Sequence, residues 1–140
     1  MHGLGILAIH GGYPEEAAEI DRGCVDQTPS DRALLEMNKF GFHHGDVGAE
    51  IAKRWQLPDT ITSAIRFYPF PQRMAAPNLA GVVHCATALA IDLEDQVAFE
   101  DWTDQVSDSL LNRLNLTREK LASKLDQWLS YCELTDLMVS

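Results

Sequence analysis

The stretch Phe40–Pro58, FGFHHGDVGAEIAKRWQLP, decides how this chain is expected to fold. From about Asp46 onward, Val47, Ile51 and Trp55 recur at four-residue steps, which predicts that they lie along one face of a helix. The charged residues of the stretch fall on the opposite side, toward water. Two histidines precede this helix, so it is entered through a loop that carries two imidazoles.

Small residues lie beside the apolar face. Gly48 and Ala52 offer little bulk, so a second helix is expected to approach closely there. Pro58 suits the first turn of a new helix because its missing N–H is not needed there, and Asp59 favours the positive end of the helix dipole. The stretch therefore predicts two packed helices joined by a tight corner.

The order and spacing of these residues resemble a family signature. Gly41–His44 is followed after two residues by Val47-Gly48, after six more by Trp55, and after one more by Leu57-Pro58. This combination resembles the central signature of the HDOD domain family, which is an all-helical relative of the HD-type metal-dependent phosphohydrolases. The resemblance runs from Met1 to about Ala90 and more loosely to the C-terminus. It implies an all-α, irregular multi-helix bundle that is HD-domain-like.

Composition bounds the class of protein. The chain has 140 residues, 46% of them hydrophobic, so a single domain over residues 1–140 with a real core is expected. The formal net charge of −10 disfavours a nucleic-acid partner, because phosphate binding needs a basic face. The sequence contains neither a signal peptide nor an apolar run of 18 residues, so no membrane partner is expected. Cys24, Cys85 and Cys132 form no CxxC pair, so free thiols in a reducing cytoplasm are the default.

Helix signals continue along the rest of the chain, and no window shows period-two alternation. Gly11–Pro14 ends a first apolar helix and opens a second, and Thr28-Pro29 caps a third, which Gly41 ends. Asn78 is expected to cap a long central helix over residues 79–93, and further helices are expected over residues 104–114 and after Thr117. The last of these helices carries one apolar stripe, made by Leu121, Leu125, Trp128, Leu129 and Cys132.

The N-terminal segment Met1–Ile9 is apolar and begins without a cap or a polar lead-in. In the resemblance, His2-Gly3 matches the central His-Asp pair of HD-type proteins, which several helices precede. The chain is therefore expected to hold about the C-terminal two-thirds of an HDOD-like domain that is truncated at its N-terminus. The alternative is a short protein that assembles with a partner.

The resemblance also implies positions for metal ligands, and three of them have changed. Gly3 stands where the pair has its aspartate, and Tyr68-Pro69 stands where family members often carry a second histidine pair. Thr87 stands where catalytic relatives carry an aspartate on the long helix. A hydrolytic site needs such groups to hold metals that activate water. We therefore expect no catalytic residues, no bound metal and no cofactor.

What remains is a candidate vestigial pocket lined by His2, His44, Tyr68 and His84, provided that the helices pack as in the family. Purely structural roles compete with this interpretation. His84 lies in an apolar helix and suits a hydrogen-bonded core histidine, and His44 suits a residue at a helix N-terminus that packs on the first helix. His43 is expected to be exposed.

Three functions follow. The first is a non-catalytic signalling module that acts through protein–protein contacts in a bacterial signalling protein, for example as the output part of a response regulator. The second is a degenerate pocket that binds a nucleotide or an anion without turnover, and the third is an active metal-dependent phosphohydrolase. An apolar first helix without its neighbours would also form a surface for self-association, so a homo-oligomer stays open.

Overall fold

The computed structural model describes residues 1–24, 28–76, 79–94, 106–124, 127 and 130. Within these residues the chain forms eight α-helices and one 3₁₀ turn and contains no strand, which confirms the predicted all-α class. The helices are α1 Leu4–Gly12, α2 Pro14–Gly23, α3 Pro29–Phe40, α4 His44–Arg54, α5 Asp59–Phe67, α6 Leu79–Glu94, α7 Asp108–Arg113 and α8 Arg118–Ala122, with the 3₁₀ turn η1 at Pro71–Arg73.

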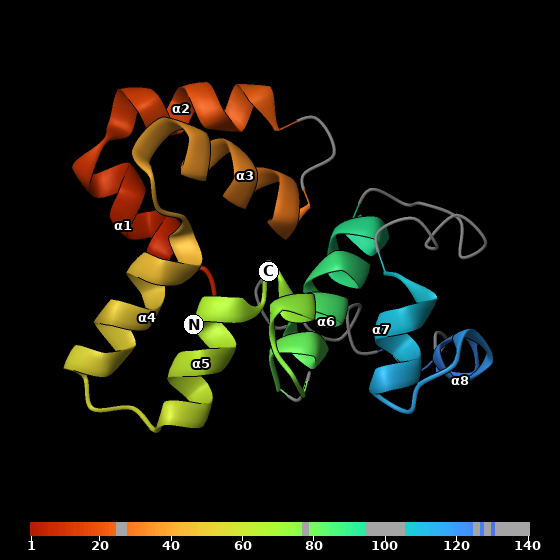
Figure 1. Cartoon of the computed structure of the whole chain (residues 1–140). Coiled ribbons are helices and arrows are strands. Elements are labelled where there is room, and N and C mark those ends of the chain that lie inside the picture. The colour runs from red at the N-terminus through yellow and green to blue at the C-terminus, as the bar shows by residue number, and fades with distance from the viewer. Residues whose placement is uncertain (25–27, 77–78, 95–105, 125–126, 128–129, 131–140) are drawn as a thin grey trace.

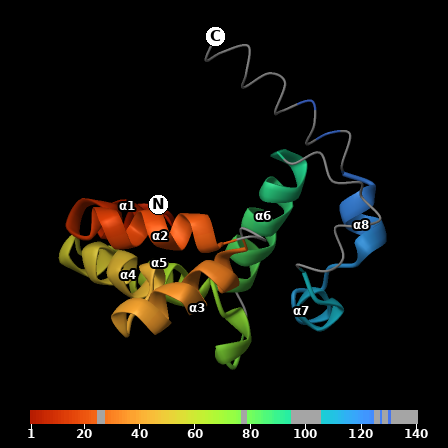
Figure 2. The ribbon, with the colours of Figure 1, turned by 90° about the horizontal axis from the view of Figure 1, so that it is seen from above.

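The helices form an irregular bundle in which α6 stands between two groups (Figure 1). On one side, α1 packs on α2 and α4, α2 packs on α3, and α4 packs on α5. On the other side lie the short helices α7 and α8, as the view from above also shows (Figure 2). Contacts of α6 with α3, α5 and η1 join it to the first group. The site described below lies where α1, α2, α3, α4 and α6 come together beside the end of α5.

The close contact between α1 and α4 depends on residues without bulk. A Cβ added to Gly5 would lie 1.8 Å from the carbonyl oxygen of His44, and one added to Gly48 would lie 2.9 Å from Cγ2 of Ile65. Glycine is therefore required at both positions by the approach of neighbouring elements. The predicted close approach of a helix at Gly48 is confirmed, because α1 meets α4 at this point.

The predicted apolar face of α4 is only partly right. The fully buried side of α4 consists of its small residues, with Ala49 and Ala52 both at 0% exposure, and these pack with Ile65 of α5. Trp55, predicted to share the buried face, is 58% exposed. Helices that pack this closely bury glycine and alanine and leave the larger side chains at the edge of the contact.

Residues that favour helix caps mark the ends of most of the described helices. Gly41 ends α3 with φ of +79°, and Thr28 Oγ1 accepts a hydrogen bond from the backbone N–H of Asp31 at 3.0 Å, which caps the start of α3. Thr117 caps α8 in the same way, as predicted. Helix α7 begins at Asp108 after a cap by Ser107, later than the predicted start at residue 104. The predicted cap by Asn78 and the apolar stripe beyond Leu121 lie outside the described residues.

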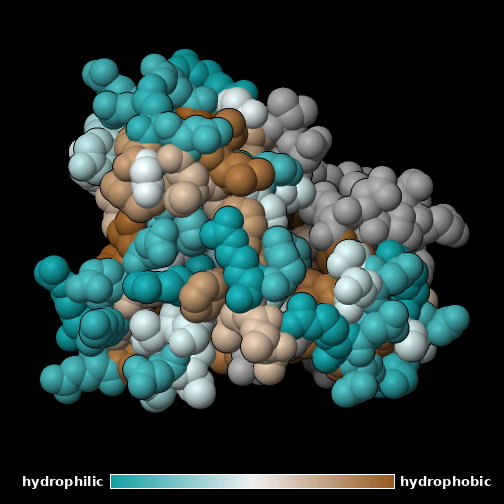
Figure 3. Space-filling model, in the orientation of Figure 1, coloured by the Kyte–Doolittle hydropathy of each residue, from teal (hydrophilic) through white to brown (hydrophobic). Residues whose placement is uncertain are grey.

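Two apolar clusters hold the described residues together. The first joins α4 to α5, and the second joins α6 to α7 through Cys85, Ala88, Val106, Leu110 and Leu111. Burial raises the pKa of the Cys85 thiol to about 11, in keeping with its predicted role as a buried free thiol. Hydrophilic residues predominate on the face in Figure 3, and hydrophobic residues reach the surface among them. Among the described helices, none has the length and apolar character needed to cross a bilayer.

Candidate functional site

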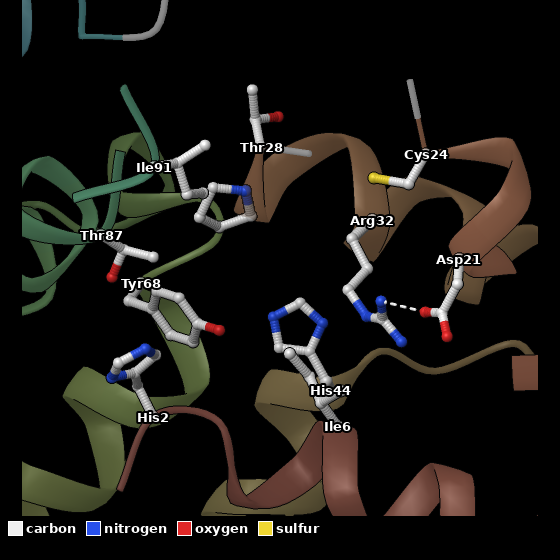
Figure 4. Close-up of a pocket in the computed structure, with 11 residues that line it drawn as sticks. His2, Ile6, Asp21, Cys24, Thr28, Arg32, His44, Tyr68, Thr87 and Ile91 are labelled. Carbon is white, nitrogen blue, oxygen red and sulfur yellow. Dashed lines mark hydrogen bonds and ion pairs between the residues drawn. The ribbon is translucent and has the colours of Figure 1, made fainter. Parts of the chain in front are cut away.

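A cavity of about 360 Å³ lies between the N-terminal helices and α6. It is lined by residues from five helices and the segments beside them, which are His2, Ile6, Asp21, Cys24, Thr28, Pro29, Arg32, His44, Tyr68, Thr87 and Ile91. Figure 4 shows these side chains around a common space, with His2, Tyr68 and His44 side by side on one part of the wall. Three of the four residues of the predicted vestigial pocket thus line the same cavity.

His43 sets the position of His44 by capping α4. The backbone of His43 is extended, its Nδ1 accepts the N–H of Gly45 at 3.0 Å, and its own N–H donates to the Asp46 carboxylate at 3.3 Å. This reciprocal pattern is a capping box in which histidine replaces the usual serine or threonine. His43 is only 5% exposed, so its predicted exposure is wrong, because the cap holds the ring against Phe70. His44 becomes the first residue of α4 and turns inward.

A buried carboxylate fixes the ring of His44. Glu36 Oε2 lies 2.6 Å from both the backbone nitrogen and Nδ1 of His44, and both residues are fully buried. Arg32, one turn before Glu36 on α3, donates Nε–H to Glu36 Oε1 at 3.0 Å. Burial alone would raise the pKa of Glu36, but the hydrogen bonds from His44 and the nearby charges outweigh it and lower that pKa. Glu36 is therefore an ionised acceptor inside the bundle.

The charged groups continue from α3 to α2 and α1. Arg32 donates to Asp21 Oδ1 at 2.6 Å, as Figure 4 shows, and His10 Nε2 lies 3.3 Å from Asp21 Oδ2. The third guanidinium nitrogen of Arg32 lies 3.4 Å from His10 Nε2. Each nitrogen of the guanidinium therefore has a partner, and two of the three partners are carboxylates. The charge of Arg32 is balanced within the protein.

The other ring nitrogen of His44 is unsatisfied. Nε2 is buried and has no hydrogen-bond partner within the part of the chain that the structure describes. Because an ionised carboxylate only accepts hydrogen bonds, Nδ1 must carry a proton, and in the neutral form of the ring Nε2 is an acceptor. In Figure 4, the hydroxyl of Tyr68 points toward the His44 ring. Among the residues that the structure describes, this buried imidazole nitrogen therefore lacks a partner.

Aromatic rings form one wall of the cavity. The ring of Tyr68 is 5.3 Å from that of His2 in an edge-on contact and 5.5 Å from that of His44, measured between centroids. Burial raises the pKa of the Tyr68 phenol strongly, so the hydroxyl stays protonated. Burial, the nearby N-terminal amine and His44 lower the pKa of His2. Near neutral pH this wall therefore presents uncharged groups at Tyr68 and His2.

His84 does not line this cavity. Its Nδ1 donates to the backbone carbonyl of Tyr68 at 2.8 Å, and the side chain is buried on the far side of that residue. It lines a separate cavity of about 280 Å³ beside Pro71, Ser107 and Arg113. The prediction of a hydrogen-bonded core histidine is confirmed. The hydrogen bond ties the end of α5 to α6 and thereby holds Tyr68 at the wall.

The positions of the expected metal ligands carry other roles. Pro69 is buried and its carbonyl accepts the hydroxyl of Ser30 at 2.6 Å, while the Thr87 hydroxyl donates to Val83 O at 2.8 Å in its own helix. A Cβ at Gly3 would meet no atom within 4 Å, so close packing does not require glycine there. Among the described residues, no group of three or more His, Cys, Asp or Glu side chains could hold a metal ion. The donor set does not fit a hydrolytic metal centre.

Sequence reasoning gave no site role to Asp21, Arg32 or Glu36. One signal was present, because Arg32 and Glu36 stand four residues apart and so share a face of the predicted helix. Ala33, buried at 0% exposure, marks that face as inward. An acid and a base at this spacing on a buried face predict an internal ion pair. Its partner His44 comes from another helix, which no local pattern indicates.

Comparison with known proteins agrees with this geometry. A crystal structure of a "putative phosphohydrolase" from Shewanella amazonensis SB2B superposes with a TM-score of 0.69 and 26% sequence identity. The match covers 90% of this chain and 46% of that protein, so this chain spans about half the length of its structural relative. No curated protein sequence matches. The HDOD domain profile matches residues 1–70, which is half of the sequence. The chain therefore belongs to the HDOD domain family.

Proposed function

We propose that this chain is a non-catalytic regulatory module of a bacterial signalling protein and acts through protein–protein contacts, in the manner of the output part of a response regulator. The observation that carries the proposal is the donor set of the cavity. It keeps one well-oriented imidazole, that of His44, but has no carboxylate at Gly3 or Thr87 to share a metal with it. Metal-assisted hydrolysis needs the complete set.

The absence of an acid at Gly3 has no steric explanation. Gly3 is the N-cap of α1 and makes no side-chain cap, and an aspartate at an N-cap stabilises a helix by only a few tenths of a kcal/mol relative to glycine. Open space surrounds the position. A side chain that would fit and would stabilise the helix is nevertheless missing, which supports a site that no longer needs a metal ligand.

Exposed apolar side chains support a role in protein contacts. Leu7 is 69% exposed, Trp55 58% and Leu34 49%, and these residues lie on α1, beside the end of α4 and on α3. Single exposed apolar residues are common on protein surfaces. Large ones on three different elements offer surface that a partner would cover.

The test measures metal content and hydrolysis on the same preparation. Elemental analysis follows purification without chelator, and bis(p-nitrophenyl) phosphate is the substrate in the presence of Mn²⁺. We expect less than stoichiometric metal and no turnover above a buffer blank. His44→Ala serves as the control for a contaminating enzyme, because only turnover that this variant abolishes comes from the cavity. Turnover of that kind would refute the non-catalytic assignment.

A further inference from the structure

The cavity is built to hold a ring rather than a phosphate. One wall consists of the rings of His2, His44 and Tyr68, and Ile6 and Ile91 add aliphatic surface. A volume of about 360 Å³ lies in the range of sites for small molecules. Faces and edges of aromatic side chains pack best against flat, polarizable ligands.

The unsatisfied nitrogen of His44 selects the polar group of the ligand. His44 is fully buried and its Nε2 has no partner among the described residues. Leaving such an acceptor empty costs free energy, which a ligand N–H would recover. The neighbouring Tyr68 hydroxyl points toward the same space and can donate to a ring nitrogen or a carbonyl. Donor and acceptor sites side by side on one ring edge are typical of purine and pyrimidine bases.

The charges of the cavity disfavour an anion. Arg32 is the permanent cation of the lining, and its guanidinium already bonds Asp21 and Glu36. Asp21 itself lines the cavity and would repel an anionic ligand. Phosphate recognition relies on free guanidinium or ammonium donors. The lining therefore has no unbalanced positive charge for a phosphate.

We propose that this cavity binds a small neutral heterocycle of the nucleobase class, with a ring N–H donated to Nε2 of His44 and the ring packed against Tyr68 and His2. The inference rests on the proposed function, because it treats the cavity as a place of binding and not of hydrolysis. It differs from the nucleotide or anion pocket expected from the sequence, since the base and not the phosphate makes the contacts.

The test uses the protein labelled with ¹⁵N-histidine and follows the ring nitrogens by NMR during titration. Purine, which has one ring N–H, is compared with 9-methylpurine, which has none, and with inorganic phosphate. We expect purine to shift the His44 ring signals saturably, and the other two to leave them unchanged. His10 lies outside the lining but contacts Arg32 and Asp21, so its signals are expected to shift less than those of His44.

Variants at Thr87 locate the binding site. Thr87 lines the cavity, and its hydroxyl donates to Val83 O of its own helix, so Thr87→Val keeps the shape of the side chain whereas Thr87→Leu adds bulk that fills the space. We expect Thr87→Leu to weaken purine binding about tenfold or more and Thr87→Val to change it less than about threefold. Tyr68→Phe, which removes only a hydroxyl, is expected to weaken it about threefold to tenfold.

Several results would overturn the inference. They are the absence of a saturable shift with purine at millimolar concentration, an equal shift with 9-methylpurine, a shift with phosphate alone, or undiminished binding to Thr87→Leu. None of these results would contradict the proposed non-catalytic function. Conversely, hydrolysis of bis(p-nitrophenyl) phosphate that depends on His44 would refute the non-catalytic assignment while leaving purine binding intact.

Discussion

Replacing Gly5 by alanine probes the contact that shapes the site. Gly5 lies in α1, and a Cβ there would lie 1.8 Å from the carbonyl oxygen of His44, whereas real contacts of this kind do not fall below 3.0 Å. Since the backbone of α1 fixes the position of the Cβ and the atom that it meets belongs to the backbone of α4, no side-chain rotation relieves the clash. Helices α1 and α4 would have to separate by about 1.2 Å, and His44 would move with α4 away from the cavity lining on α1.

The magnitude follows from two opposing terms. Over-packing of a core lowers the free energy of unfolding by about 1–3 kcal/mol, and we expect the upper end of this range because the clash is with a rigid backbone. Alanine regains about 1 kcal/mol over glycine in helix propensity. The net expected loss is therefore about 2 kcal/mol in the free energy of unfolding, or roughly 6 °C in Tm for a chain of this length. Urea denaturation followed by circular dichroism at 222 nm measures it.

Gly11→Ala is the matched control. Gly11 lies in the same helix, and a Cβ there would meet no atom within 4 Å, so only the propensity term remains. This variant is expected to gain up to about 1 kcal/mol. If Gly5→Ala were as stable as Gly11→Ala, the close approach of α1 to α4 would not exist as described, and the geometry of the cavity would fail with it.

Three further predictions concern the network and the caps. Burial would raise the pKa of Glu36, but the hydrogen bonds from His44 outweigh it and lower that pKa, so Glu36 contributes stability that is present above the usual carboxyl pKa and is lost as the pH falls. Urea titrations between about pH 3 and 7 should therefore show a shallower acid dependence for Glu36→Gln. Thr28→Ala removes the cap of α3 and should lower the free energy of unfolding by about 1 kcal/mol, as thermal unfolding would measure, whereas Thr28→Ser should keep most of the stability that the cap provides. Cys85 is buried and has a pKa of about 11, so it should resist alkylation by iodoacetamide at pH 8 in the native state, while the partly exposed Cys24 reacts first. Mass spectrometry of the digested protein would show which cysteine is alkylated. Fast modification of Cys85 would contradict its burial.

The helix ends were predictable because their causes are local. Thr28 caps the N–H three residues ahead, and Gly41 takes the left-handed conformation itself, so neither depends on the rest of the fold. The buried face of α4 was not predictable from hydrophobicity alone. Trp55 is 58% exposed, whereas the small residues Ala49 and Ala52 are fully buried and Gly48 lies against the backbone of Gly5.

The cavity was predictable only as far as the family resemblance reached. That resemblance gave His2, His44 and Tyr68, which the structure places on one wall, and His84, which it places behind Tyr68. Glu36 stayed without a role, because its partner comes from the next helix. The inward turn of His44 depends on a cap made by the histidine before it, a role that sequence patterns assign to serine, threonine or aspartate.

The contact between Glu36 and His44 resembles the way in which metal sites orient a histidine ligand. In metal sites a carboxylate commonly holds one ring nitrogen of a histidine so that the other meets the metal. Glu36 holds Nδ1 in that manner here, although Gly3 and Thr87 stand where the resemblance places the carboxylates that would share a metal with Nε2. A purely structural histidine in a core would be expected to satisfy both nitrogens, as burial of a lone acceptor is costly. The buried Nε2 of His44, which has no partner among the described residues, is the feature that the proposed ligand would explain.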